Sequence, residues 1–340
     1  MSPRGLARGN EGEELSVWGW IAVAVLAAAI LCAGAAFLLA QIASRRGLGP
    51  ADAAAPWDAE HGNEARREIE WFLANGPERV EIVSRDGLRL RGRYLPSGRG
   101  RQAILLVHGY RAKSGEGDFA PLLRFYHGLG MDILVIDQRA HGQSEGGRIC
   151  FGVKERYDCV DWLHWLNQRA KPDDLFMAGL SMGAATVLMA TELDLPANLR
   201  CVIADCGYTS PWDICAHVLK GMNRLPVWPF LQMANRMLKG LAGYDLRECA
   251  ALSAMSRNSR LPVLFIHGEK DGFVPPSMSR ANYAACLAQK KLVIVPEAGH
   301  AMSAWEAPER VKAEAAAFIA RFSTAPGAGN ASGAAAPGEE

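Results

Sequence analysis

The sequence has no excess of charge of either sign. Its 340 residues include 37 lysines and arginines and 36 aspartates and glutamates, which gives a formal net charge of +1 at pH 7. Nucleic-acid-binding proteins present a basic surplus, and solvating tails present a run of acidic residues. The chain has neither, so we expect no nucleic-acid partner, and its function must depend on a local site.

The sequence also lacks the cysteine patterns of metal sites and disulfide frameworks. None of its eight cysteines forms a Cys-x-x-Cys pair or belongs to a Cys/His cluster. Seven of them follow the apolar N-terminal segment, an odd number without regular spacing. Most are therefore expected to be free thiols, as in a reducing compartment, and neither a metal nor a cofactor is expected.

Charge is missing altogether from residues 17–43, which are rich in alanine, leucine, isoleucine and valine. A helix of this length can cross a hydrocarbon core of about 30 Å with some tilt. Trp18 and Trp20 lie at one end and Arg45 and Arg46 follow the other, as is usual at membrane interfaces. We predict a single transmembrane helix that anchors the chain in membrane lipid.

The alternative for this segment is a cleaved signal peptide. Signal peptides begin with positive charge, whereas three glutamates at positions 11–14 precede this run, which favours an uncleaved anchor. The arginines after the span lie closer to it than those before it, so the positive-inside rule leans towards a cytoplasmic position for the rest of the chain. The sequence does not decide on which side of the membrane the rest of the chain lies.

Composition divides the remaining chain into a folded domain and polar segments. Residues 1–16 form an N-terminal tail, and residues 44–65 are rich in alanine, glycine and proline, as in a linker. Residues 323–340 have almost no large apolar side chains and are expected to be disordered. A single domain is therefore predicted over residues 66–322.

Apolar runs and polar loops alternate along this domain. Residues 80–94 alternate around an Asp-Gly pair, as in a hairpin. Further strands are expected at 103–107, 132–136, 175–179, 201–205, 262–266 and 291–295, and helices at 119–130, 153–168 and 308–322. This order predicts an α/β fold with a mostly parallel sheet and helices on both faces.

One strand runs into a sharp turn that carries a serine. Residues 179–183 read Gly-Leu-Ser-Met-Gly, between an apolar strand and an alanine-rich helical segment. This is the Gly-x-Ser-x-Gly pattern, in which a side chain at either glycine would collide with a neighbouring element. Ser181 is then exposed at a helix N-terminus, where free N–H groups favour a developing oxyanion.

Other motifs follow the neighbouring strands. They are His108-Gly109, an Asp-x-Arg-x-His-Gly-x-Ser loop at 137–144, Gly-Glu-Lys-Asp at 268–271 and Ala-Gly-His at 298–300. With the serine motif, they resemble the α/β-hydrolase superfamily over roughly residues 70–322. The resemblance is to Bem46-like and serine-aminopeptidase-like hydrolases, some of which carry an N-terminal membrane anchor.

The resemblance implies a catalytic triad in the chain order serine, acid, histidine. The histidines that follow Ser181 are His217, His267 and His300. His300 follows the last strand and is predicted to be the base, while His267 precedes the acid loop and is predicted to be structural. Asp271 is the predicted acid. Asp205 and Glu269 remain alternatives.

The oxyanion hole is predicted from the same resemblance. It implies two backbone N–H donors, those of Met182 and Tyr110. His108 is then a loop-organising residue, and Arg139 and His141 brace loops near the site.

Residues 210–260 interrupt the alternation of strands and helices and are rich in aromatic residues and methionine. They predict a short helical lid with an apolar wall, and the alternative is ordinary connecting helices.

These expectations describe a membrane-anchored serine hydrolase that cleaves carboxyl esters, or thioesters, through an acyl-enzyme. Its substrate would be a small-molecule or lipid-like acyl compound. The alternatives are a serine peptidase or an acyltransferase on the same fold. An alternative of another class is a membrane-tethered binding protein without catalysis.

Overall fold

The computed structural model of the chain describes residues 16–46, 57–222 and 224–324. Most of the two tails expected at residues 1–16 and 323–340, and the middle of the expected linker, lie outside these ranges.

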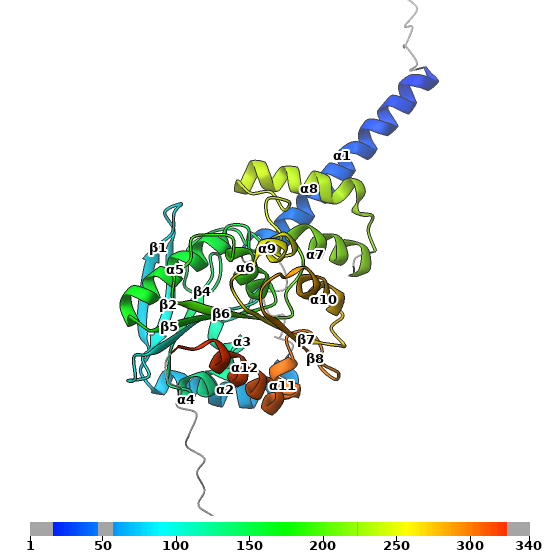
Figure 1. Cartoon of the computed structure of the whole chain (residues 1–340). Coiled ribbons are helices and arrows are strands. Elements are labelled where there is room, and N and C mark those ends of the chain that lie inside the picture. The colour runs from blue at the N-terminus through cyan, green and yellow to red at the C-terminus, as the bar shows by residue number, and fades with distance from the viewer. Residues whose placement is uncertain (1–15, 47–56, 223, 325–340) are drawn as a thin grey trace, which may run out of the picture.

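One eight-stranded sheet forms the centre of the molecule, in the order β1-β2-β4-β3-β5-β6-β7-β8 (Figure 1). The strands are β1 (Glu78–Val83), β2 (Arg89–Leu95), β3 (Gln102–Val107), β4 (Met131–Asp137), β5 (Asp174–Leu180), β6 (Leu199–Asp205), β7 (Val263–Gly268) and β8 (Lys290–Val295). β2 pairs antiparallel with β1 and β4, and every other pair of neighbours is parallel. The predicted hairpin and mostly parallel sheet are confirmed.

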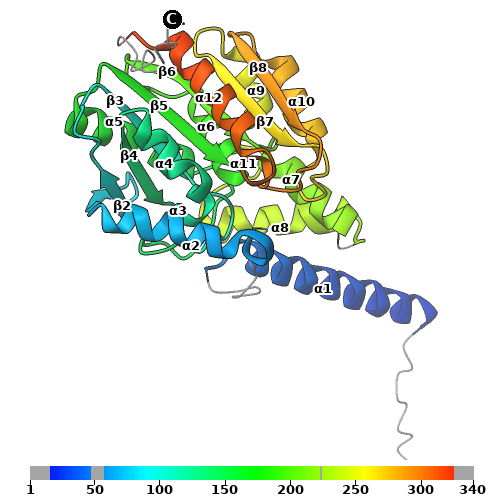
Figure 2. The same ribbon diagram turned by 90° about the horizontal axis from the view of Figure 1, so that it is seen from below.

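Helices cover both faces of the sheet (Figures 1 and 2). One face carries α5 (Glu155–Ala170), α6 (Met182–Ala190), α9 (Ala251–Arg257) and α10 (Pro276–Ala285). The other carries α2 (Asp58–Ala74), α3 (Gly115–Asp118), α4 (Ala120–Gly128), α11 (Ser303–Glu306) and α12 (Pro308–Phe322). β5 is buried along its whole length because both of its faces are covered.

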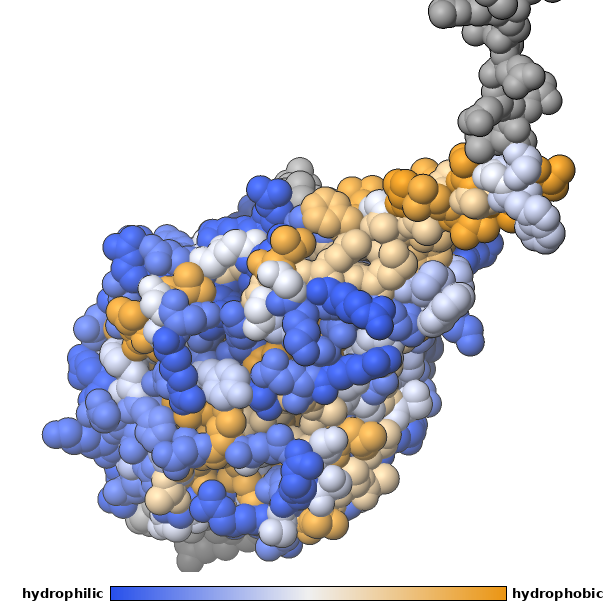
Figure 3. Space-filling model, turned by 90° about the horizontal axis from the view of Figure 1, so that it is seen from above, coloured by the Kyte–Doolittle hydropathy of each residue, from blue (hydrophilic) through white to orange (hydrophobic). Residues whose placement is uncertain are grey.

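The N-terminal helix α1 (Val17–Ser44) projects from this domain (Figure 1). It is long and apolar enough to cross a membrane. Its first half is exposed as far as Leu31, which is 74% exposed, and Figure 3 shows the apolar surface of this helix. Its later turns bury Ala36, Ala40 and Ser44 against the rest of the protein.

Three helical segments follow β6 and pack together on the side of the domain from which α1 projects. They are α7 (Pro211–His217), the π-helical η1 (Val218–Met222) and α8 (Val227–Ala242). α8 also packs against α1. We refer to α7, η1 and α8 as the cap. They occupy the range for which a lid was predicted.

The range expected to be a linker, residues 44–65, has folded structure at both of its ends. At the first end, the Ile149 N–H donates to the Ser44 carbonyl at 2.7 Å. At the other end, α2 begins at Asp58 and packs on α4, with Trp57 and Phe72 buried. Composition alone did not reveal this start, because alanine and charged residues suit both a linker and an amphipathic helix.

If α2 belongs to the core, Phe72→Ala will lower the free energy of unfolding by about 3 kcal/mol, the usual cost of removing a buried aromatic ring. Urea denaturation of the detergent-solubilised protein measures this change. Leu73→Ala, at a side chain that is 45% exposed on the same helix, is the matched control and should change stability little. Equal stability of the two variants would contradict a packed α2.

Candidate active site

Ser181 occupies a strained turn between β5 and α6. Its backbone lies at φ 55° and ψ −114°, a conformation that non-glycine residues rarely adopt. A Cβ on Gly179 would overlap the Gly183 carbonyl, and a Cβ on Gly183 would overlap the carbonyl of Val107 in β3. The expectation that neither glycine can carry a side chain is confirmed.

Two hydrogen bonds connect Ser181 to a histidine and a carboxylate from two other loops. The Ser181 Oγ lies 2.9 Å from the His300 Nε2, and the His300 Nδ1 lies 2.7 Å from the Asp271 Oδ2. Asp271 follows β7 and His300 follows β8. Because the strands are parallel, their carboxyl ends meet at one edge, and this brings together residues that are far apart in sequence.

Asp271 is held by four donors. Its Oδ1 accepts the N–H groups of Phe273 and Val274 at 2.9 and 2.8 Å, and its Oδ2 accepts from His300 and from His267 Nε2 at 3.1 Å. Burial alone would raise the pKa of this carboxyl, but the hydrogen bonds from the two histidines outweigh burial and lower the pKa below its ordinary value. The carboxylate is therefore ionised at neutral pH.

The two alternative acids are engaged elsewhere. The Asp205 Oδ1 accepts from Ser303 Oγ at 3.0 Å, and burial raises the pKa of this carboxyl to about 6. Glu269 forms an exposed ion pair with Arg280 at 2.6 Å. Of the three candidates, Asp271 is the one that contacts His300.

His267 has a more specific position than the sequence indicated. Its ring is fully buried, and its Nδ1 lies 2.7 Å from the Ser279 hydroxyl while its Nε2 faces Asp271. The Nε2 lies between two acceptors, the Val274 carbonyl at 2.9 Å and the carboxylate, so it carries the ring proton and shares it between them, while the hydroxyl donates to Nδ1. Its spacing of four residues before Asp271 at the end of β7 was the available signal, but only the folded loop brings the two side chains together.

The loop after β3 lies against Ser181 and carries Tyr110. A Cβ on Gly109 would lie 3.4 Å from the Ser181 Cβ, so the two backbones approach closely. Within the described part of the chain, no hydrogen bond uses the N–H of Tyr110 or of Met182. Both groups are therefore available as donors.

Two buried histidines hold the loops around this site. The His108 Nε2 accepts from the Gln138 N–H at 3.0 Å, and its Nδ1 donates to the Gly109 carbonyl. The His141 Nε2 accepts from the Arg111 N–H at 3.0 Å. Burial lowers the pKa of His141 to about 3, so this ring stays uncharged.

Arg139 ties the same region to α5. Its guanidinium binds the carboxylates of Asp158 at 2.6 Å and Asp86 at 2.8 Å. These contacts agree with the expectation that His108 organises its loop and that Arg139 and His141 brace loops near the site.

An apolar cavity of about 200 Å³ adjoins the serine. Its floor includes Ser181, Met182 and Tyr110, and its walls come from α1, α7, η1 and α8 and from three loop residues. The wall residues are almost all apolar: Leu39, Ala40, Ala43, Phe151, Tyr208, Ile214, Cys215, Val218, Leu219, Ala234, Leu238 and Phe273.

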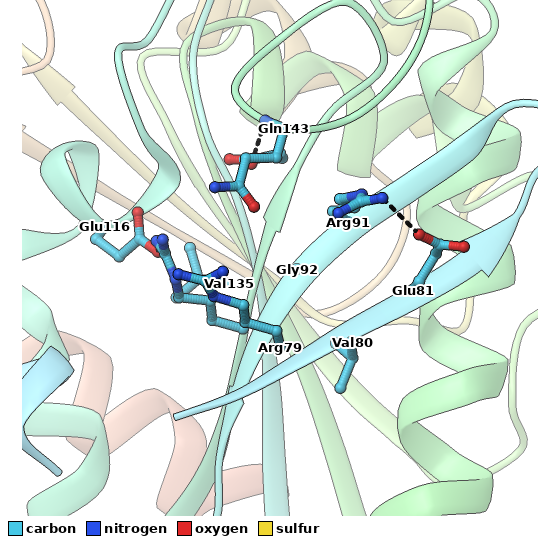
Figure 4. A pocket seen from close by; sticks show the side chains of 10 residues that line it. Arg79, Val80, Glu81, Arg91, Gly92, Glu116, Val135 and Gln143 are labelled. Carbon is cyan, nitrogen blue, oxygen red and sulfur yellow. Dashed lines mark hydrogen bonds and ion pairs between the residues drawn. The ribbon is translucent and has the colours of Figure 1, made fainter. Parts of the chain in front are cut away.

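A second hollow of about 150 Å³ lies at the antiparallel end of the sheet, between β1, β2 and β4 (Figure 4). Two of its three arginines are paired with carboxylates, Arg91 with Glu81 at 3.1 Å and Arg93 with Glu116. It contains neither Ser181 nor His300, so the cavity beside the serine is the candidate substrate site.

Comparison with known proteins identifies the family. A family model described as alpha/beta hydrolase fold matches residues 102–220. The protein YqkD of Bacillus subtilis is 30% identical over 226 residues, which cover 65% of this chain and 72% of YqkD. The chain belongs to the α/β-hydrolase superfamily. It is Bem46-like, since protein bem46 of Schizosaccharomyces pombe is 24% identical over 231 residues, 66% of this chain and 70% of bem46.

Solved structures share the fold of this α/β-hydrolase. The Pyrococcus furiosus esterase Pf2001 superposes with a TM-score of 0.60 at 23% identity, over 74% of this chain and 95% of that chain. An esterase from Exiguobacterium antarcticum gives a TM-score of 0.54 at 16% identity, over 72% of this chain and 100% of the other. Family membership supports a hydrolase.

The positions of the carboxylates lead to one prediction for this α/β-hydrolase. Asp271→Asn should lower kcat about 10⁴-fold, because the amide favours the wrong tautomer of His300. Asp205→Asn is the matched control and should retain activity within about tenfold. Ester hydrolysis by the two purified variants decides the assignment, and the reverse ranking would make Asp205 the acid.

His267 leads to a second prediction, as a residue that positions Asp271. His267→Leu removes a charge-assisted hydrogen bond, so kcat should fall about ten- to hundredfold, with KM little changed. His267→Gln keeps a donor and should recover part of the loss. The rates are expressed per Ser181 that reacts with a fluorophosphonate, so that misfolded protein does not count. If both variants retain the wild-type kcat on this basis, His267 has only a packing role.

Proposed function

We propose that this chain is a membrane-anchored serine hydrolase that cleaves carboxyl esters, or thioesters, through an acyl-enzyme. The observation that carries this proposal is the unbroken path of two hydrogen bonds from Ser181 through His300 to Asp271, at the floor of an apolar cavity. A serine hydroxyl is a poor nucleophile at neutral pH and needs a base that is itself oriented by a carboxylate.

In the acylation step, the Ser181 Oγ attacks the carbonyl carbon of the ester while the His300 Nε2 takes the hydroxyl proton. The N–H groups of Tyr110 and Met182 donate to the oxyanion that forms. The tetrahedral intermediate then collapses, the bond to the leaving oxygen or sulfur breaks, and His300 gives its proton to the departing alcohol or thiol.

Deacylation repeats these steps with water. His300 takes a proton from a water molecule as its oxygen attacks the acyl carbon. The second intermediate collapses to the carboxylic acid, and the proton returns to the Ser181 Oγ. Asp271 stays ionised throughout and stabilises the imidazolium, which its lowered pKa supports.

The contacts at the end of α1 support an anchor that is retained. The Tyr110 hydroxyl donates to the Ala43 carbonyl at 2.7 Å, and Arg148 Nη1 donates to the Ser44 Oγ at 2.9 Å. Cleavage of this segment as a signal peptide would remove these partners and one wall of the cavity. All eight cysteines are free, which supports a domain on the cytoplasmic side.

The cap supports the lid proposed for residues 210–260. α7, η1 and α8 contribute Ile214, Leu219, Ala234 and Leu238 to the cavity wall, so their movement would change access to Ser181. An apolar wall favours an acyl chain over a charged peptide, and this supports esters over peptides as substrates.

A series of p-nitrophenyl esters tests the activity directly. The wild-type protein should hydrolyse them and should be labelled by a fluorophosphonate, whereas Ser181→Ala should lose about 10⁴-fold or more in kcat and all labelling. Hydrolysis that survives Ser181→Ala, or a wild-type serine that resists the label, would contradict the proposal.

A further inference from the structure

The membrane-helix candidate α1 is part of the cavity that holds Ser181. Leu39, Ala40 and Ala43 line this cavity together with Ser181 and Met182. The end of α1 is also fixed to the loops of the site, because Tyr110 donates to the Ala43 carbonyl and Arg111 to the Ile42 carbonyl. The last turn of α1 is therefore hydrogen-bonded directly to the loop that carries Tyr110.

The length of α1 places the cavity close to a bilayer. Residues 17–31 are largely exposed, but at 1.5 Å per residue they span roughly 22 Å, less than a hydrocarbon core of about 30 Å. The hydrocarbon must reach further along the helix, to about the level of Phe37 and Leu38, which are 43% and 58% exposed. Ala36 and Ala40, in the same turns, are buried against the protein.

α8 packs against α1 and has the chemistry of an interfacial helix. Its inner side buries Leu231, Ala234 and Leu238, and the last two line the cavity. Its outer side exposes Arg236 and Lys239. Lys239 pairs with Asp245 at 3.5 Å, and the long side chain of Arg236 can reach lipid headgroups. Trp228, near its start, is 74% exposed, and indoles favour the membrane interface.

The surface agrees with this placement. In Figure 3 the apolar surface of α1 continues onto the part of the domain beside it, while most of the remaining visible surface is polar. One side of the cavity wall thus belongs to helices at the hydrocarbon boundary, and its floor carries the nucleophile.

We propose that the enzyme takes its substrate from the bilayer, as an ester whose acyl chain resides in the hydrocarbon, and that α1 forms the acyl-binding wall. This inference rests on the proposed serine-hydrolase function. Leu39, Ala40 and Ala43 contact the acyl chain, and the two alanines leave the space that the chain occupies. The anchor is then a determinant of specificity as well as an attachment.

Larger side chains on this wall test the inference. In Ala40→Leu and Ala43→Leu, the ratio of kcat/KM for p-nitrophenyl dodecanoate over butyrate should fall about tenfold or more. Each methylene group of the substrate that is kept out of an apolar site lowers kcat/KM about fourfold. Ala35→Leu is the matched control, because Ala35 is exposed on the same helix, and it should keep the wild-type ratio.

Rates are expressed per Ser181 titrated with fluorophosphonate, so misfolded protein does not count. If neither leucine variant titrates, Leu39→Ala provides the opposite test, because it widens the wall and should raise the ratio of palmitate over dodecanoate. Unchanged ratios in the titrating variants would overturn the inference. A wild-type protein that does not titrate would instead contradict the proposed function.

Surface dilution tests delivery from the bilayer. The full-length protein is reconstituted in phosphatidylcholine vesicles with p-nitrophenyl palmitate, and phosphatidylcholine is added at constant bulk ester concentration before reconstitution. A tenfold dilution of ester in the membrane should lower a subsaturating rate about tenfold. A rate that stays constant would mean that hydrolysis does not follow the ester concentration in the membrane and would overturn the inference, although the esterase activity itself would stand.

Discussion

The structure depends on the backbone of Ser181 being held where a non-glycine residue is strained. The packing of β5 and α6 against β3 imposes this conformation, since Gly179 and Gly183 allow contacts that any side chain would block. β5 lies in the buried middle of the sheet, so the strain is maintained by many surrounding contacts rather than by one. The turn aims the hydroxyl towards the loops after β7 and β8, where Asp271 and His300 lie.

The hydrogen bonds of the site distinguish an ionised carboxylate from histidines that connect backbone groups. Asp271 is buried but receives two backbone and two histidine hydrogen bonds, and these keep it ionised in a region where burial favours neutral groups. The rings of His108 and His141 are buried, and their hydrogen bonds connect backbone groups instead of a carboxylate. The same residue type thus has different roles according to whether its ring is hydrogen-bonded to a carboxylate or to the backbone.

α1 is both the candidate membrane helix and a part of the active-site cavity. A flexible tether would let the domain tumble, and the pocket would face water. Here Tyr110, whose N–H is a proposed oxyanion donor, is bonded through its hydroxyl to the end of α1, and α1 contributes a wall of the cavity. If α1 crosses a bilayer as proposed, its direction sets the orientation of the pocket relative to that bilayer, and the contact of α8 with α1 sets the depth of α8.

The sequence by itself determined the fold class, the strand order along the chain and the serine turn, because these depend on local apolar periodicity and on glycine sterics at residues 179 and 183. The resemblance added Asp271 and His300 as candidates but left Asp205 and Glu269 open. Only the tertiary structure brought His267 to Asp271, put α2 into the range expected to be a linker, and made Leu39, Ala40 and Ala43 part of the pocket. These features depend on contacts between segments far apart in the chain, and local sequence pattern carries no record of such contacts.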